Sequence, residues 1–435
     1  MHIRFFRRGL LAALFSLFAC SASAQTGAWS GKLDIQGTSL MLIFHLDDDA
    51  CTLDVPAQGA KGIPAEKVLT PEGKVRITVP TIGAVYEGFL LNRKLMGQFT
   101  QGTATLPLIL APGAPEVRRS QTPVGPFSYS TEEVSFDNGP AHLCGTLTLP
   151  ADCSEQTPVL LMVTGSGLQN RDEELFDHRP FAVIAHALAN AGIATLRYDD
   201  RGAGESTGDV VGMSIDDLKA DAQAGLDLLR QRFSRVGIIG HSEGGSIALL
   251  LAAEGKVDFA VTLAGAVTPL REILLQQNEY QLRKAGFPDE VVQEFRDGLS
   301  KVFDAVVSGE PLPRSAFSAI PEQLLQGVDA AMAQFSTPYM RSLIALDVSQ
   351  QLPRIACPVL AFNGTRDIQV PCESNLSALR SGLPAERATI VPVEGANHLL
   401  QHCTTGDVAE YGEIEETIAP EVLQTLVTWL QEHAR

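Results

Sequence analysis

The sequence predicts an α/β protein in which a mostly parallel sheet, covered by helices on both faces, follows a small antiparallel β domain. Three observations lead to this prediction. The chain has 435 residues, more than one ordinary core accommodates, so we expect two domains. Short runs of alternating polar and apolar residues fill the first part, as in strands with one buried face. After about residue 128, continuous apolar strands alternate with helices, as in parallel sheets buried on both faces.

Residues 1–24 have the three parts of a bacterial secretory signal. The start is basic, an apolar run follows that is too short to span a membrane, and the small residues 22–24 precede a cleavage site before Gln25. We therefore expect an exported protein, periplasmic or secreted, with no transmembrane segment in the mature chain. One alternative stays open. The run from Leu17 to Cys20 resembles the lipobox of bacterial lipoproteins, in which Cys20 would carry a lipid anchor.

Composition excludes several classes of function. Apolar residues make up 45% and charged residues 19% of the chain, which indicates a folded globular protein. The net charge of −18 opposes binding to nucleic acid and to anionic membranes, so we expect no nucleic-acid partner. The cysteines show no zinc-site spacing, and we predict neither a metal nor a cofactor. The sequence leaves the oligomeric state open.

Residues 25–112 are expected to form the antiparallel β domain. Alternating runs such as Lys32–Ile35, Leu40–Leu46 and Lys74–Val79 are separated by turn-forming residues, which predicts about eight strands. This part of the chain holds no catalytic constellation. Residues 113–127 are rich in proline and glycine and are predicted to be a linker.

Residues 128–435 are expected to form the sheet and its helices. The alternation of strands and helices stops after residue 263 for about 85 residues, and a structureless connection of that length is uncommon in compact domains. We therefore predict an inserted helical cap at about residues 268–352. It would cover the C-terminal edge of the strands, where ligands bind in open α/β sheets. The expected strands are 129–136, 143–149, 159–163, 194–198, 236–239, 259–263, 358–363 and 389–393, and the expected helices include 180–191, 215–232, 270–284, 290–307 and 420–432.

A serine flanked by glycines lies between a predicted strand and a predicted helix. The residues are Gly240-His241-Ser242-Glu243-Gly244. Glycines suit this place because a strand that turns sharply into a helix leaves no room for β-carbons. The turn lifts Ser242 to the top of the sheet, and the amides that follow it lie at a helix N-terminus, where negative charge is stabilised. We predict that Ser242 is a nucleophile.

A serine nucleophile needs a base to take its proton, and the base needs a carboxylate to orient it. Asp367 and His398 each follow a predicted strand, and the order Ser242, Asp367, His398 is the one expected for a nucleophile on such a turn. These residues form the predicted catalytic triad. His402, one helical turn beyond His398, is a rival base, whereas His241 is expected to face away from the triad and pack.

Two backbone N–H groups are also needed to hold the oxyanion of a tetrahedral intermediate. One predicted donor is the N–H of Glu243, directly after the nucleophile. The second is expected from the glycine-rich loop 164–172, where Ser166 and Gly167 are both candidates and the choice stays open. A further turn at residues 198–206 lacks the third glycine of a dinucleotide fingerprint, so we predict a structural turn with Asp199 paired to Arg201.

Three motifs carry a resemblance to a known family: Gly-His-Ser-Glu-Gly at 240–244, Thr-Gly-Ser-Gly-Leu-Gln-Asn-Arg-Asp at 164–172 and Tyr-Asp-Asp-Arg-Gly-Ala-Gly-Glu-Ser at 198–206. With them, residues 128–435 resemble the α/β-hydrolase superfamily, and in particular its exported bacterial esterases, which are grouped with serine aminopeptidase-like hydrolases. Residues 25–112 resemble the β domain that precedes some of these esterases.

The resemblance implies a Ser-His-Asp hydrolase, most often a carboxylesterase, that cleaves a small-molecule ester through an acyl-enzyme. A serine peptidase, of the aminopeptidase or dipeptidyl-peptidase type, and an acyltransferase are the alternatives, and the acyl and alcohol groups of the substrate stay open. An aminopeptidase would need an acidic cap residue to hold the substrate's α-amine, for which Glu272, Glu279 and Glu290 are available.

Spacing suggests one disulfide. Cys372 follows Asp367 by five residues, and Cys403 follows His398 by five residues. A hydrogen-bonded triad would bring the two loops together, and an exported protein permits disulfides. We therefore predict a possible disulfide between Cys372 and Cys403.

Overall fold

The computed structural model describes residues 26–434 except for 36–37, 48–49, 59, 71–72, 116–117 and 311–334. The predicted signal at residues 1–24, with Cys20, lies outside the described residues. The chain divides into two compact units. The first runs to Arg118 and includes Tyr411–Glu413, and the second comprises Arg119–Glu410 and Ile414–Arg435.

The first unit is a closed antiparallel β-barrel in which each strand pairs with the next and β1 also pairs with β8. Side chains alternate along the strands, so that Leu95 and Phe99 on β7 are buried in the barrel, whereas Met96 faces outward. The predicted antiparallel β domain is confirmed. The strands are β1 (Ala28–Ile35), β2 (Thr38–Leu46), β3 (Cys51–Val55), β4 (Ala60–Leu69), β5 (Val75–Val79), β6 (Ala84–Leu91), β7 (Lys94–Gln101) and β8 (Ala104–Pro112).

The second unit is built on an eight-stranded sheet with the order β16-β15-β14-β13-β11-β12-β10-β9. Strands β11 to β16 are parallel to one another, and β10 and β9 are antiparallel strands at one edge of the sheet. The predicted mostly parallel sheet is confirmed. Its strands are β9 (Ser130–Asn138), β10 (Ala141–Leu149), β11 (Val159–Val163), β12 (Ala194–Tyr198), β13 (Val236–His241), β14 (Ala260–Leu263), β15 (Val359–Gly364) and β16 (Ala388–Val393).

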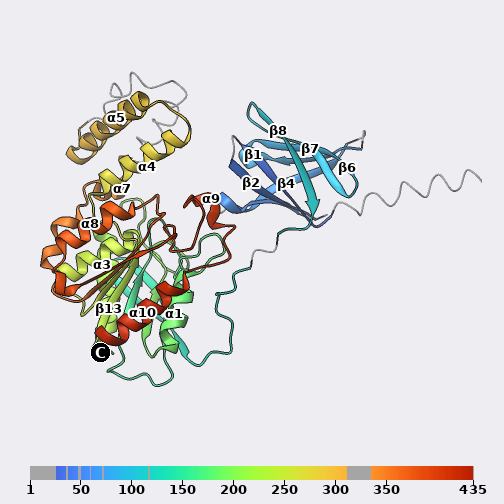
Figure 1. Ribbon diagram of the computed structural model, residues 1–435. Coiled ribbons are helices and arrows are strands. Elements are labelled where there is room, and N and C mark those ends of the chain that lie inside the picture. The colour runs from blue at the N-terminus through green and yellow to red at the C-terminus, as the bar shows by residue number, and fades with distance from the viewer. Residues whose placement is uncertain are drawn as a thin grey trace, which may run out of the picture. The chain divides into compact units, whose positions relative to one another are not determined.

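Helices cover both faces of this sheet (Figure 1). On β11, Leu161 points into the core shared with α2 (Ile215–Arg230), α3 (Glu243–Ala253) and α8 (Cys372–Gly382), while Leu160 and Met162 point into the core shared with α1 (Pro180–Asn190) and α10 (Pro420–His433). Strand β11 is therefore apolar at every position, because both of its faces are buried.

The predicted helical cap lies between β14 and β15. Its described helices are α4 (Leu270–Lys284), α5 (Asp289–Ser308) and α7 (Pro338–Ile344), drawn in yellow to orange in Figure 1. Buried side chains of α5 and α7, such as Phe303 and Leu343, join the core of the α3 face. One short helix, α9 (Val408–Tyr411), precedes α10. Among the described residues, no helix is both long enough and apolar enough to cross a membrane.

Candidate active site

Ser242 lies on the sharp turn between β13 and α3. Its backbone has φ 52° and ψ −116°, a conformation that costs energy for a residue with a side chain. The glycines on either side are required by space. A β-carbon on Gly240 would lie 2.0 Å from the carbonyl oxygen of Gly244, and one on Gly244 would lie 2.1 Å from that of Val163. The turn therefore exists because these two positions carry no side chain.

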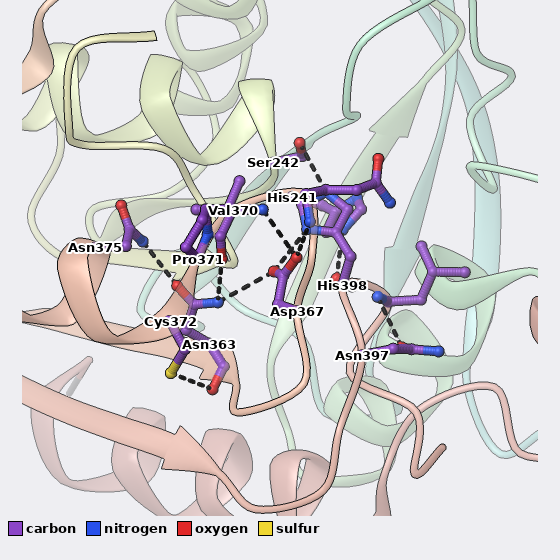
Figure 2. A network of polar contacts seen from close by, with 12 residues as sticks. His241, Ser242, Asn363, Asp367, Val370, Pro371, Cys372, Asn375, Asn397 and His398 are labelled. Atoms are coloured by element: carbon purple, nitrogen blue, oxygen red, sulfur yellow. Dashed lines mark hydrogen bonds and ion pairs between the residues drawn. The ribbon is translucent and has the colours of Figure 1, made fainter. Parts of the chain in front are cut away.

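The three side chains of the predicted triad meet at the C-terminal edge of the sheet (Figure 2). Nε2 of His398 lies 3.0 Å from Oγ of Ser242, and Nδ1 of His398 lies 2.8 Å from Oδ2 of Asp367. His398 and Asp367 are only 4% and 6% exposed, so water competes little for these hydrogen bonds. The structure thus brings together the residues that the sequence predicted.

The Asp367 carboxylate is fixed by several donors besides His398. Its Oδ1 accepts the backbone N–H groups of Gln369 and Val370 at 2.8 and 2.9 Å, and its Oδ2 accepts the Asn363 amide at 3.1 Å. Since a carboxylate only accepts, Nδ1 of His398 carries the proton and Nε2 presents its lone pair to the Ser242 hydroxyl. Such an imidazole can take a proton from the serine.

The rival base His402 and the neighbouring His241 make different contacts. His402 is partly exposed and contacts the carboxylates of Glu416 and Glu421 at 3.0 and 2.9 Å. His241 is buried, as expected, but it does more than pack. Its ring lies 4.9 Å from the His398 ring, and its Nε2 donates to the backbone carbonyl of His398 at 3.1 Å.

A buried carboxylate, Glu173, joins His241 to the glycine-rich loop. Oε1 of Glu173 accepts the ring Nδ1–H of His241 at 2.8 Å and the backbone N–H of Gly165 at 2.7 Å. Burial lowers the pKa of His241, but the charge of Glu173 and the hydrogen bonds to Glu173 and His398 outweigh it, so the pKa is raised. Sequence reasoning missed Glu173, because nothing in the pattern of residues 164–173 marks one acidic residue over its neighbours.

A second buried carboxyl, Asp200, bonds to the same loop at two points. It accepts the hydroxyl of Thr164 at 2.7 Å and the backbone N–H of Gln169 at 2.9 Å. Burial is the main reason why the pKa of Asp200 is raised to about 8. The two hydrogen bonds act in the opposite direction but do not outweigh burial. The amide of Gly165 is occupied by Glu173, so the two predicted oxyanion donors of this loop, Ser166 and Gly167, remain the candidates.

The residue after Ser242, Glu243, is itself buried, with 6% of its surface exposed. Its carboxyl accepts hydrogen bonds from the hydroxyl of Tyr339 on α7, at 2.5 Å, and from the hydroxyl of Ser166. Burial raises the pKa of Glu243 to about 7, and the two hydrogen bonds oppose the shift. The sequence offered no signal for Tyr339, because the cap has no strand ends by which to place a side chain.

The ion pair predicted within the turn at 198–206 is wrong. Asp199 and Arg201 do not pair with each other. Asp199 accepts the Arg171 guanidinium at 2.7 Å, and Arg201 contacts Asp221 of α2 at 2.7 Å. The reason is that Arg171 reaches back from the glycine-rich loop, a long-range contact that local spacing does not reveal.

The predicted disulfide between Cys372 and Cys403 is not formed, and all six described cysteines are free. Sγ of Cys372 lies 3.7 Å from the carbonyl oxygen of Asn363, whereas Sγ of Cys403 lies 3.4 Å from that of Gly395. The two loops do meet through Asp367 and His398, but each thiol points to a different backbone carbonyl. The disulfide prediction is therefore wrong for this structure.

The described residues contain no group of three or more His, Cys, Asp or Glu side chains that could hold a metal ion. The sheet, the turn at Ser242 and the inserted cap define the class of the protein as an α/β hydrolase. The family described as "Serine aminopeptidase, S33" matches residues 178–402, a range that includes Ser242, Asp367 and His398. The chain belongs to this family.

Several known proteins are similar to this chain. Esterase EstD of Thermotoga maritima is 25% identical over 311 residues, which cover 70% of this chain and 69% of that protein. An acyl transferase of Photobacterium leiognathi is 32% identical over 147 residues, 33% of this chain and 44% of that protein.

Solved structures are also similar. Ferulic acid-bound Est1E from Butyrivibrio proteoclasticus has a TM-score of 0.45 and 17% identity, and covers 69% of this chain and 98% of its own. Proline iminopeptidase of Mycobacterium smegmatis has a TM-score of 0.44 and 16% identity, and covers 70% of this chain and 99% of its own.

Proposed function

We propose that the protein is a serine esterase that hydrolyses carboxylic esters of small molecules through an acyl-enzyme. One observation carries the proposal: a buried imidazole, His398, lies between the Ser242 hydroxyl at 3.0 Å and the Asp367 carboxylate at 2.8 Å. The similarity to an esterase of Thermotoga maritima over 70% of the chain supports esters as the substrate class.

In this mechanism, His398 takes the hydroxyl proton as Ser242 attacks the ester carbonyl. The N–H of Glu243 and that of Ser166 or Gly167 hold the oxyanion, and Asp367 stabilises the imidazolium that forms. His398 then gives its proton to the leaving alkoxide, which departs as the alcohol. Water, deprotonated by His398, attacks the acyl-enzyme and releases the acid and the free serine.

The family description favours a second candidate function, that of an aminopeptidase. The acidic residues of the cap help to distinguish the two functions. An aminopeptidase needs a free carboxylate for the α-amine of its substrate. Arg296 on α5 is paired with Glu272, at 2.7 Å, and also with Glu279, so both carboxylates already face a positive charge. Their pairing makes Glu272 and Glu279 less suited to an α-amine and supports the esterase at these two positions, whereas Glu290 stays a candidate for the peptidase.

The two candidates differ in their substrates. We expect the protein to hydrolyse p-nitrophenyl esters of short and medium chain length and to leave aminoacyl-anilides uncleaved. Ser242→Ala should lower kcat by about 10⁴-fold or more and abolish labelling by a fluorophosphonate. His402→Ala is the matched control for His398→Ala, and only the latter should lose activity.

Two results would change the assignment. Faster cleavage of anilides than of esters would replace the esterase with the peptidase. Transfer of the acyl group to an added alcohol in preference to water would indicate an acyltransferase, because the same triad serves both reactions.

A further inference from the structure

Three segments of the second unit meet at one carboxyl group next to the nucleophile. Glu243 is the first residue of α3, Ser166 belongs to the glycine-rich loop after β11, and Tyr339 belongs to the cap helix α7. The Tyr339 hydroxyl donates to Oε2 of Glu243 at 2.5 Å, and the Ser166 hydroxyl bonds to the same carboxyl. We call these residues the Tyr339–Glu243–Ser166 bridge.

The bridge joins the backbones that supply the proposed oxyanion donors. The N–H of Glu243 is one donor, and Ser166 is a candidate for the other. Their side chains are bonded to each other, and Tyr339 holds the shared carboxyl from the cap. A small displacement of such donors is costly in rate, because the oxyanion must lie within hydrogen-bond distance of both.

We propose that Tyr339 is a positioning residue that couples the cap to the oxyanion hole, so that the hole is fully shaped only when α7 is seated. The inference rests on the proposed esterase function and extends it to the cap. It assigns a role in the chemical step to a helix of the cap.

The surroundings of the bridge support this role. Burial raises the pKa of Tyr339, and the negative charge of Glu243 raises it further, so the hydroxyl remains a donor throughout the physiological range. The buried carboxyl of Asp200 lies close enough to Glu243 for their charges to interact. Helix α7 is fixed independently of the bridge, because the Ser342 hydroxyl accepts the N–H of Ile215 at 3.0 Å. Removing the Tyr339 hydroxyl should therefore leave the cap folded.

The test compares Tyr339→Phe with Tyr280→Phe, a matched change on cap helix α4. With p-nitrophenyl acetate, a substrate too small to need the cap for binding, Tyr339→Phe should lower kcat by about 10- to 100-fold. KM should change by less than about twofold. Tyr280→Phe should keep the wild-type kcat. A trifluoromethyl ketone, which forms a tetrahedral adduct on Ser242, should bind Tyr339→Phe more weakly by the same factor as kcat/KM.

Glu243 provides a second set of variants. Glu243→Gln keeps an oxygen that accepts from Tyr339 and should retain most of the kcat, whereas Glu243→Ala should resemble Tyr339→Phe. Combining Glu243→Ala with Tyr339→Phe should add little further loss, because both changes break the same bridge.

The outcomes distinguish the coupling role of Tyr339 from the proposed esterase function. Wild-type kcat and wild-type ketone affinity in Tyr339→Phe would overturn the coupling while leaving the esterase intact. A lower unfolding midpoint with unchanged kcat would assign Tyr339 a purely structural role and would also overturn it. Full ester hydrolysis by Ser242→Ala would overturn the proposed function itself.

Discussion

Three buried ionisable side chains lie next to the predicted triad. Glu173, Asp200 and Glu243 are each less than 8% exposed, and each bonds to a backbone or side-chain donor next to the site. Such groups are costly to bury unless their hydrogen bonds are satisfied, and once satisfied they hold their neighbours in one arrangement. At the scale of single residues, the site is positioned by carboxyl groups as much as by glycines.

Glu243 should make stability depend on pH. Its pKa of about 7 in the folded protein lies above its ordinary value of 4.5, so between these values the folded chain holds a proton that the unfolded chain has lost. The stability that this group contributes is present below pH 4.5 and is lost as the pH rises through 7. Glu243→Gln does not titrate. The free energy of unfolding of Glu243→Gln, relative to that of the wild type, should therefore increase as the pH rises, by up to about 3 kcal/mol.

Urea unfolding at a series of pH values from 4.5 to 8 would measure this difference. Asp200, whose pKa is about 8, remains in both proteins, and because the charge of Glu243 contributes to raising that pKa, the double variant Glu243→Gln/Asp200→Asn, compared with Asp200→Asn alone, isolates Glu243. A constant difference between variant and wild type across the series would contradict the prediction.

The pair of His241 and Glu173 should matter for both stability and rate. His241→Ala leaves the Glu173 carboxylate buried without its imidazole, which we expect to cost about 3–5 kcal/mol of unfolding free energy. It also removes the donor to the His398 carbonyl, so kcat should fall. Urea unfolding and ester hydrolysis measure the two effects.

The matched control is His402→Ala, because His402 also pairs with carboxylates but is partly exposed. This change should stay within about 0.5 kcal/mol of the wild type. Equal effects of the two histidine changes would contradict a positioning role for His241.

At the scale of elements, the turn between β13 and α3 depends on two glycines. Gly240→Ala should disrupt the turn, because the added β-carbon would meet the backbone of Gly244, which cannot move away as a flexible side chain can. We expect a loss of at least about 3 kcal/mol of stability together with the loss of activity. Thermal unfolding and fluorophosphonate labelling check both.

Gly212→Ala is a suitable control for this change. Its β-carbon would meet only the carboxylate tip of the exposed Asp209 side chain, which can rotate away. Stability should change by less than about 1 kcal/mol. If Gly240→Ala were as mild as Gly212→Ala, the close approach of the backbones would not be what selects glycine.

Sequence patterns were sufficient for the strands of the sheet, for most of its helices and for the three residues that meet at the edge of the sheet, but they did not predict helix α8. Ser242, Asp367 and His398 could be chosen because each follows a strand, and parallel strands end at a common edge. Glu173 and Tyr339 could not be chosen, since Glu173 is one of several acidic residues in and after the loop that follows β11, and Tyr339 lies in the cap, where no strand end marks it. The same limit explains the errors at Arg201 and Cys372, where local spacing suggested a partner that the side chain does not meet.

At the scale of the whole molecule, the two units have separate cores. The barrel core and the two cores of the sheet share no residue, and the linker residue Gln121 is already bonded to Ile418 of the second unit at 2.8 Å. A protease site inserted after Ala114 should therefore allow the barrel to be cut from the full protein. We expect kcat/KM for p-nitrophenyl esters to be unchanged by the cut.

Size-exclusion chromatography would establish whether the two pieces separate. A large fall in kcat/KM after cleavage, with Ser242 still labelled by a fluorophosphonate, would mean that the barrel contributes to substrate binding. The uncut protein carrying the same insertion is the control.

The barrel and the open sheet differ in their edge strands. A closed barrel has no edge strand with unpaired backbone groups, whereas the open sheet has two edge strands, β16 and β9. Pro392 interrupts the row of donors on β16, and on β9 Glu132 and Glu133 carry exposed charges that are tied to Arg232 and Arg171. Prolines and charges at such margins discourage the addition of a foreign strand. The protein is thereby protected against edge-to-edge aggregation at high local concentration.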